Sequence, residues 1–236
     1  SLYPDTAIVK STPLPEAVAL SSMPQDIRER FVSIGAMISE QGLIAAAVDF
    51  SRGHFMISGP RNSGKSVALT SLMRSHESKK DGSFSFVFTP RPNFISNIEG
   101  MTNVAVGISA CEAQLEEIMA GVEAMGDNVP EMYFFIDDCE DLADGGFAMT
   151  IEQFMRNMKQ KLHIITTGDA GTYLRAYSGW LAEVKKPKSG LLLKPDPQTD
   201  GDILGVKIKA LPGQIFPPGR GYLCLDRQAV LIQVAI

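Results

Sequence analysis

The sequence predicts an α/β fold built on a mostly parallel sheet, with helices on both faces and added strands at the C-terminal edge. Short, continuously apolar segments alternate with segments whose apolar residues recur at helical spacing. A glycine-rich loop lies directly between one of these apolar segments and one of these helices. Unbroken apolar strands are typical of parallel sheets, because helices cover such sheets on both faces.

The expected elements of the parallel part follow this alternation. The expected strands are residues 42–50, 54–58, 84–89, 104–108, 132–136 and 163–167. The expected helices are residues 64–76, 109–125 and 147–160. Ser109 and Glu112 have the spacing of a capping box, which predicts that the second helix begins at Ser109.

We expect a single domain over residues 1–236, with a lead-in at 1–33, a P-loop core at 34–195 and C-terminal strands at 196–236. Four prolines interrupt the lead-in, so long helices are not expected there. Residues 190–193, 221–225 and 229–235 are expected to be added strands and a hairpin at one edge of the sheet. Because the chain begins with Ser1, we expect a fragment of a longer protein.

The composition is that of an ordinary globular protein. Hydrophobic residues make up 44% of the 236 residues, and charged residues 21%. The net charge of -5 disfavours a chain whose main task is to bind nucleic acid, because phosphate contacts require a basic face. The three cysteines form no CxxC pair, which disfavours a zinc site and a disulfide framework.

The glycine-rich loop has the pattern of a P-loop. Its residues are Gly59, Pro60, Arg61, Asn62, Ser63, Gly64, Lys65 and Ser66. Glycines let consecutive backbone N–H groups turn toward phosphates, and the helix that follows directs its positive end at them. Lys65 supplies a compact positive charge, and the Ser66 hydroxyl is a ligand for Mg²⁺. The loop therefore predicts binding of ATP with Mg²⁺.

Two acidic residues end the expected strand at 132–136. Asp137 is expected to hold Mg²⁺, and Asp138 stands where a catalytic base would orient the attacking water. A polar residue at the tip of the strand at 163–167 commonly senses the γ-phosphate in such ATPases. Thr166 and Thr167 are both candidates for this position, and a purely structural role as β-branched strand residues explains them equally well.

With these residues in place, the chain resembles the FtsK/SpoIIIE branch of P-loop ATPases. More narrowly, it is similar to the tandem ATPase domains of EccC/EssC, the motor component of type VII secretion systems. The resemblance is carried by Ser33-Ile34-Gly35 with residues 46–50, by residues 54–59, by Asp137-Asp138 with Asp141-Leu142, and by residues 190–193, 202–205, 217–222 and 232–235.

This resemblance implies a RecA/FtsK-like P-loop NTPase fold within a hexameric chain anchored at the cytoplasmic face of the bacterial membrane. It implies sister ATPase domains on the same chain and export of small helical proteins. The end of the chain is similar to the last domain of the tandem, where substrates are recruited. Arg220 is implied to lie near the nucleotide or a neighbouring domain.

Two departures from the family pattern bear on hydrolysis. Asp138 replaces a glutamate, and Gly168-Asp169 stands where the family often carries arginines, which leaves Arg175, Arg220 or a neighbouring subunit to supply one. The favoured hypothesis is a weakly hydrolysing ATP-binding domain that recruits substrate or regulates a sister domain. The alternatives are a fully active motor domain and an FtsK-type DNA translocase domain.

Overall fold

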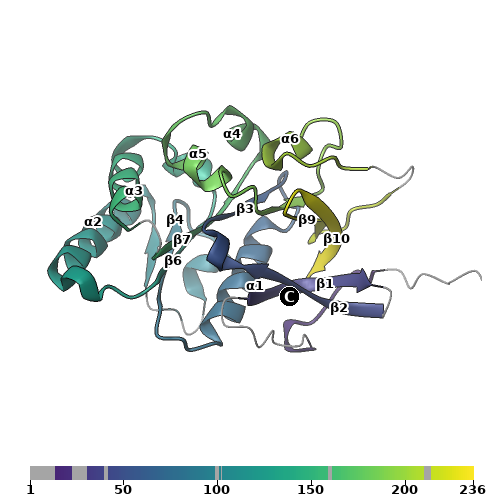
Figure 1. Cartoon of the computed structure of the whole chain (residues 1–236), viewed down its shortest axis with the longest axis horizontal. Coiled ribbons are helices and arrows are strands. Elements are labelled where there is room, and N and C mark those ends of the chain that lie inside the picture. Colours follow the sequence, from purple (N-terminus) through teal and green to yellow (C-terminus); the bar gives the residue numbers. More distant parts are fainter. Residues whose placement is uncertain are drawn as a thin grey trace, which may run out of the picture.

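The computed structural model describes residues 14–22, 31–39, 42–98, 101, 103–158, 161–209 and 214–236. These residues form one ten-stranded sheet with the order β2-β1-β10-β9-β8-β3-β7-β6-β4-β5 (Figure 1). Strands β8, β3, β7, β6, β4 and β5 are parallel to one another, while β9, which is antiparallel to β8, and then β10, β1 and β2 continue the sheet in antiparallel pairs.

The parallel part carries the alternation that the sequence predicts. Its strands are β3 (Phe55–Ser58), β4 (Phe84–Thr89), β5 (Val104–Val106), β6 (Met132–Ile136), β7 (Leu162–Gly168) and β8 (Gly190–Leu193). Its helices are α1 (Lys65–Glu77), α2 (Ile108–Met125), α3 (Gly145–Met158), α4 (Ala170–Arg175), α5 (Gly179–Lys185) and α6 (Gly201–Leu204). Every residue of β3, β6, β7 and β8 is buried, which confirms the prediction from their unbroken apolar sequences.

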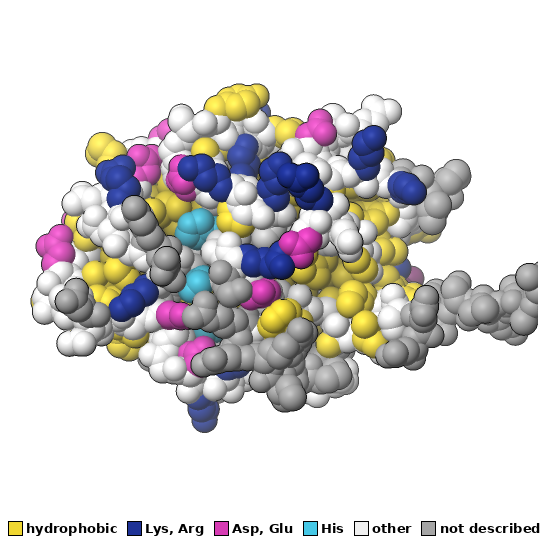
Figure 2. All heavy atoms as spheres, in the orientation of Figure 1, with side chains coloured by type: hydrophobic (Ala, Val, Ile, Leu, Met, Phe, Trp, Pro, Cys, Tyr) yellow, Lys and Arg dark blue, Asp and Glu magenta, His cyan; other side chains and the backbone are white. Residues whose placement is uncertain are grey.

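The antiparallel part joins the two ends of the described chain. Its strands are β1 (Phe31–Ser39), β2 (Gly42–Asp49), β9 (Arg220–Leu225) and β10 (Gln228–Val234). β10 lies between β9 and β1, so the last strand completes a sheet that the first strands begin. Hydrophobic side chains gather on the surface over this end of the sheet (Figure 2).

Two hydrophobic layers enclose the sheet. Helix α1 packs on one face through Ala68, Leu69, Leu72 and Met73. Helices α2, α3 and α5 pack on the other face, and their buried residues include Leu115, Ile151, Phe154, Trp180 and Val184. Because successive side chains of a strand point to opposite faces, neighbouring residues of β3 and β6 enter different layers. The mixed α/β fold with added antiparallel strands is therefore the one predicted.

Three expectations differ from the structure. The capping box is wrong, because α2 begins at Ile108 after Gly107 and has no side-chain cap, while Glu112 accepts a hydrogen bond from the Phe147 backbone N–H. The strand at 190–193 was expected at one edge of the sheet, yet β8 pairs in parallel with β3 inside it, and β10 lies between β9 and β1. Strand β1 begins at Phe31, within the expected lead-in at 1–33, and residues 1–13 and 23–30 lie outside the described part. Helices α4 and α5 were not expected either, because each spans only two turns or fewer.

Candidate functional site

The glycine-rich loop connects the end of β3 to the start of α1. Gly64 has a φ of 98°, a left-handed conformation that a residue with a Cβ rarely adopts. A Cβ at this position would also come within 2.7 Å of the Gly219 backbone nitrogen. The Gly219 N–H donates a hydrogen bond to the Ser63 carbonyl at 2.7 Å. The residue that precedes β9 therefore packs against the loop and holds it in place.

Lys65 and Ser66 open helix α1 on the side of the loop. The Lys65 ammonium donates to the carbonyls of Gly59 at 2.9 Å and Pro60 at 3.3 Å. The Ser66 hydroxyl lies 3.1 Å from both carboxylate oxygens of Asp137. The structure therefore brings the last residues of the P-loop and the first acid after β6 into one site, as the sequence predicts.

Asp137 is fully buried and accepts hydrogen bonds from three elements. Besides Ser66, the Thr167 hydroxyl donates to it at 2.6 Å and the Asn93 side-chain amide at 2.8 Å. Burial raises the pKa of Asp137, and the Thr167 hydrogen bond opposes this shift. The donors fix the carboxylate beside the Ser66 hydroxyl, an arrangement of oxygen atoms that suits Mg²⁺.

The two threonines of β7 have different partners. Thr167 donates to Asp137 and accepts from the Asp138 backbone N–H at 2.9 Å, so its hydroxyl is used within the site. The Thr166 hydroxyl instead lies 2.6 Å from the buried Tyr173 hydroxyl on the other face of the sheet. Thr167 is thus the threonine that adjoins Asp137, and it does not line the open cleft.

A cleft of about 760 Å³ opens above the loop. Its wall includes the predicted residues Pro60, Arg61, Asn62, Gly64, Lys65, Ser66 and Asp138. It also includes Arg91, Phe94, Glu140 and Asp169, which sequence reasoning did not assign to the site. These four follow the ends of β4, β6 and β7, and the carboxyl ends of parallel strands are where such folds bind ligands. That rule was the available signal for finding them.

The electrostatics of the cleft depend on these added residues. Arg91, 58% exposed, pairs with Asp141 at 2.7 Å, which raises the pKa of the guanidinium. Burial raises the pKa of Glu140, the nearby charges of Asp138 and Asp169 add to this shift, and Lys65 opposes it. Asp138 has a φ of 46°, a left-handed backbone conformation at a half-buried position.

Arg220 does not line the cleft. Its guanidinium donates to the carbonyls of Leu14 at 3.1 Å and Pro15 at 2.6 Å, and to the Gln233 side chain at 3.1 Å. Arg220 therefore links β9 to the first described segment and to β10. Only its neighbour Pro218 reaches the wall of the cleft.

Mg²⁺ and a nucleoside triphosphate fit these residues. A hydroxyl and a carboxylate converge below a glycine-rich loop, and a lysine and two arginines line the space above it. The cleft volume falls within the range of about 300–1,000 Å³ common for small-molecule sites. Among the described residues, no group of three or more His, Cys, Asp or Glu side chains could form an all-protein metal site.

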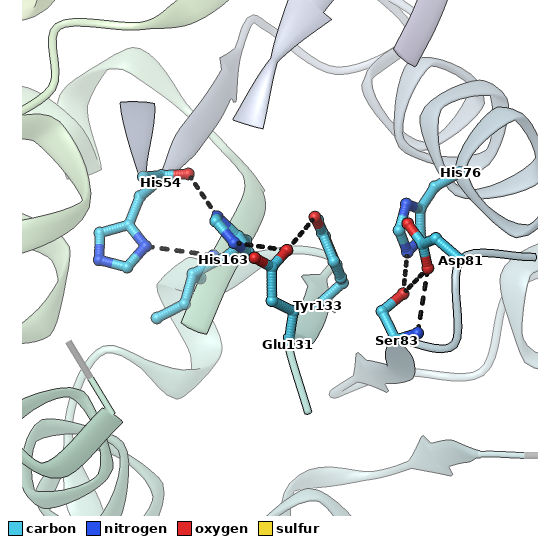
Figure 3. Close-up of polar contacts among 9 residues, drawn as sticks. His54, His76, Asp81, Ser83, Glu131, Tyr133 and His163 are labelled. Atoms are coloured by element: carbon cyan, nitrogen blue, oxygen red, sulfur yellow. Dashed lines mark hydrogen bonds and ion pairs between the residues drawn. The ribbon is translucent and has the colours of Figure 1, made fainter. Parts of the chain in front are cut away.

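A second polar cluster lies at the opposite end of the same strands (Figure 3). His54 immediately precedes β3, while Tyr133 and His163 lie near the starts of β6 and β7. Tyr133 stacks between His76 and His163, with ring centroids 3.8 and 4.6 Å away. The Tyr133 hydroxyl donates to Glu131 at 3.2 Å. All three histidines of the chain are in this cluster, away from the cleft.

No protein-family model and no curated protein sequence matches the chain. Solved structures do match it. EssC (ATPases 2 and 3) from Geobacillus thermodenitrificans has a TM-score of 0.73 and 16% identity, covering 94% of this chain and 45% of that one. Thermomonospora curvata EccC (ATPases 2 and 3), in complex with a signal sequence peptide, has a TM-score of 0.71 and 20% identity, covering 95% and 44%.

A third match is the pCW3 conjugation coupling protein TcpA in its monomer form with ATPγS. It has a TM-score of 0.64 and 16% identity, covering 95% of this chain and 71% of that one. The chain therefore has the fold of EccC/EssC type VII secretion ATPase domains, and it spans less than half the length of the EssC and EccC structures. Within the described residues, none of the helices is long and apolar enough to cross a membrane.

Proposed function

We propose that this chain is an ATP-binding domain of a type VII secretion motor, with weak intrinsic hydrolysis and a role in substrate recruitment or regulation. The observation that carries the proposal is that the Ser66 hydroxyl lies 3.1 Å from the Asp137 carboxylate, below the P-loop. The fold shared with EssC and EccC ATPase domains over about 95% of the chain supports the assignment to that class of motor.

The residues of the site have distinct roles in this proposal. Backbone N–H groups of the loop after Pro60 bind the phosphates, and Lys65 exchanges the carbonyls of Gly59 and Pro60 for phosphate oxygens. Ser66 and Asp137 hold Mg²⁺, which neutralises phosphate charge when bound. Thr167 and Asn93 keep the Asp137 carboxylate in place through their hydrogen bonds.

Slow hydrolysis is proposed because two arginines near the site are already paired, which leaves Lys65 and the P-loop residue Arg61 as the cations that line the cleft without a described carboxylate partner. Arg91 lines the cleft but is paired with Asp141 at 2.7 Å. Arg220 is occupied by the carbonyls of Leu14 and Pro15. The lack of an arginine at the γ-phosphate costs about 10³- to 10⁵-fold in rate in related phosphoryl-transfer enzymes.

The partners follow from the matched structures. The EssC and EccC structures contain ATPases 2 and 3, and the EccC structure contains a signal sequence peptide. We therefore propose that the partners of this chain are sister ATPase domains and secreted helical proteins, within a hexamer at the cytoplasmic face of the bacterial membrane. EssC and EccC are both represented by structures of their cytoplasmic domains.

Two alternatives each have an observation in their favour. Arg91 and Glu140 both line the cleft, which favours a fully active motor domain if Arg91 leaves Asp141 in the assembly. The similarity to the conjugation coupling protein TcpA favours a DNA translocase domain, while the net charge of -5 counts against it.

The test is calorimetric titration of the purified chain with ATPγS in the presence and absence of Mg²⁺. Lys65→Ala is expected to lower the affinity by at least tenfold, because each charge-assisted phosphate contact contributes about 1.5–3 kcal/mol. The matched control is Lys207→Ala, which removes an exposed lysine outside the cleft. Unchanged binding by Lys65→Ala, or equal losses in both variants, would refute the assignment.

A further inference from the structure

Arg220, the first residue of β9, connects segments that are distant in sequence. Its guanidinium donates to the carbonyls of Leu14 and Pro15, at 3.1 and 2.6 Å. Its Nε–H donates to the side-chain oxygen of Gln233 on the neighbouring strand β10, at 3.1 Å. The several N–H donors of a planar guanidinium make these contacts at the same time, which a lysine cannot do. Arg220 therefore attaches the lead-in segment, residues 14–22, to the hairpin of β9 and β10.

Gln233 is buried and uses both ends of its side-chain amide. While its oxygen accepts from Arg220, its nitrogen donates to the Pro218 carbonyl at 3.1 Å. The amide also packs on Gly219, where a Cβ would come within 2.8 Å of the Gln233 nitrogen. A reversed amide would place its NH₂ group against the guanidinium, so Arg220 fixes the direction in which Gln233 donates. Through Gln233, Arg220 therefore acts on Pro218, which lines the cleft.

Gly219 extends this connection to the P-loop. Its N–H donates to the Ser63 carbonyl at 2.7 Å, and its own carbonyl accepts from the Val234 N–H at 2.9 Å. In a trans peptide, the carbonyl and the N–H of the next residue point in opposite directions. Because the Ser63 carbonyl faces Gly219, the Gly64 N–H points away from Gly219. Gly64 lines the cleft, and its N–H belongs to the group that binds phosphate in the proposed function.

We infer that Arg220 is a positioning residue for the nucleotide, and that it couples the lead-in segment to phosphate binding. Acting through the side chain of Gln233, it holds Gly219 in place and so sets the direction of the Gly64 N–H. The inference rests on the proposed binding of Mg-ATP. Coupling between two sites is reciprocal, so a bound nucleotide must also hold the lead-in segment more firmly on the domain.

A purely structural role for Arg220 is the competing reading. The lead-in segment has other attachments, because Leu14 and Val18 are buried and the Ile236 N–H donates to the Val18 carbonyl at 2.8 Å. A chain that lacks the guanidinium is therefore expected to fold. If the role of Arg220 were purely structural, its loss would lower the stability of the chain and leave the nucleotide affinity of the folded chain unchanged.

The first experiment compares Arg220→Met with Arg227→Met in the full chain. Methionine keeps an unbranched stem and removes every donor. Arg227 is exposed in the turn at the far end of the same hairpin, which makes it the matched control. In calorimetric titration with ATPγS and Mg²⁺, Arg220→Met should bind about tenfold more weakly, because it loses hydrogen bonds from a charged donor. Arg227→Met should bind like wild type. Arg220→Lys keeps the charge but not the fork of donors, so its affinity should lie between the two.

Gln233→Glu interrupts the connection at a different point. A glutamate still accepts from Arg220 but cannot donate to the Pro218 carbonyl, so the attachment of the lead-in segment is kept while its link to the cleft is lost. Its affinity for ATPγS should also fall about tenfold. This variant decides the question if Arg220→Met does not fold, because an affinity within about twofold of wild type would then refute the inference.

Hydrogen exchange gives a readout that a purely structural role would not change. Saturating Mg²⁺ and ATPγS should slow exchange in residues 14–22 of the wild type about tenfold, the factor by which Arg220→Met lowers the affinity. In Arg220→Met, the nucleotide should leave exchange in this segment unchanged. Wild-type exchange that does not respond to bound ATPγS would overturn the inference, as would an affinity of Arg220→Met within about twofold of wild type. A wild-type chain that binds no nucleotide would instead refute the proposed function, and this inference with it.

Discussion

Lowering the pH from 7 to 5.5 is expected to destabilise the chain through His54. The His54 Nδ1 atom accepts a hydrogen bond from the Ile164 backbone N–H at 3.1 Å, so the imidazole must be neutral with its proton on Nε2. Burial lowers the pKa of His54 to about 4, and the neighbouring His163 adds to the shift, while Glu183 opposes it. Protonation of His54 Nδ1 would replace the acceptor by a second N–H group. This group would face the Ile164 N–H, and the hydrogen bond between them would be lost.

The size of the effect follows from the two pKa values. The unfolded chain protonates His54 near its ordinary pKa of about 6.5, whereas the folded chain does so near 4. The unfolded state therefore binds more protons between these values, and stability present above pH 6.5 is lost as the pH falls toward 4. At about 1.4 kcal/mol for each pKa unit, the loss between pH 7 and 5.5 is about 1 kcal/mol. His76, whose pKa burial also lowers, shifts stability in the same direction.

The assay is urea unfolding followed by circular dichroism at pH 7, 6 and 5.5. His54→Asn is the matched control, because its side-chain oxygen is an acceptor at the position of Nδ1 and does not titrate. The wild type should lose about 1 kcal/mol more than this variant over the same interval. Equal pH dependence in the two proteins would show that His54 is not held neutral by the fold.

Three further results are expected. Thr167→Val should lower the free energy of unfolding by about 2 kcal/mol in urea titrations, because Asp137 loses a 2.6 Å hydrogen bond. Thr167→Ser retains the hydroxyl and should keep most of that free energy. The isolated chain should turn over Mg-ATP more slowly than about 1 s⁻¹ in a coupled assay, and a faster rate would favour the active motor. Duplex DNA should form no submicromolar, salt-sensitive complex in fluorescence anisotropy, because the net charge is -5.

The local elements could be predicted because their signals are contained in a few residues. The strands at 84–89, 132–136 and 190–193 have the predicted bounds, since each is an apolar run ended by a polar or charged residue. The P-loop could be placed for the same reason, with its glycines, Lys65 and Ser66 adjacent in sequence. The second helix begins one residue before Ser109, and Glu112 accepts a hydrogen bond from α3 instead of capping its own helix.

The remaining features depend on segments that are distant in sequence. β1 pairs with β2, which follows it directly, and on its other side with β10, whose residues lie about two hundred positions away in the sequence. Arg91 and Glu140 enter the cleft only because β4, β6 and β7 end side by side. Arg220 was placed near the nucleotide by resemblance alone. Its hydrogen bonds to the carbonyls of Leu14 and Pro15 could not be predicted, because the sequence does not show where the first segment packs.

The charges around the cleft suggest which step limits hydrolysis. In the proposed site the supply of positive charge is the limiting feature, because Arg91 is paired with Asp141. The acidic residues Asp138, Glu140 and Asp169 line the same space as Lys65 and Arg61. Negative charge that develops on the phosphate oxygens would face these acidic residues, with Lys65, Arg61 and Mg²⁺ to compensate it. An arginine from a neighbouring domain, or the release of Arg91 when Asp141 finds another partner, would then raise the rate without any change in nucleotide affinity.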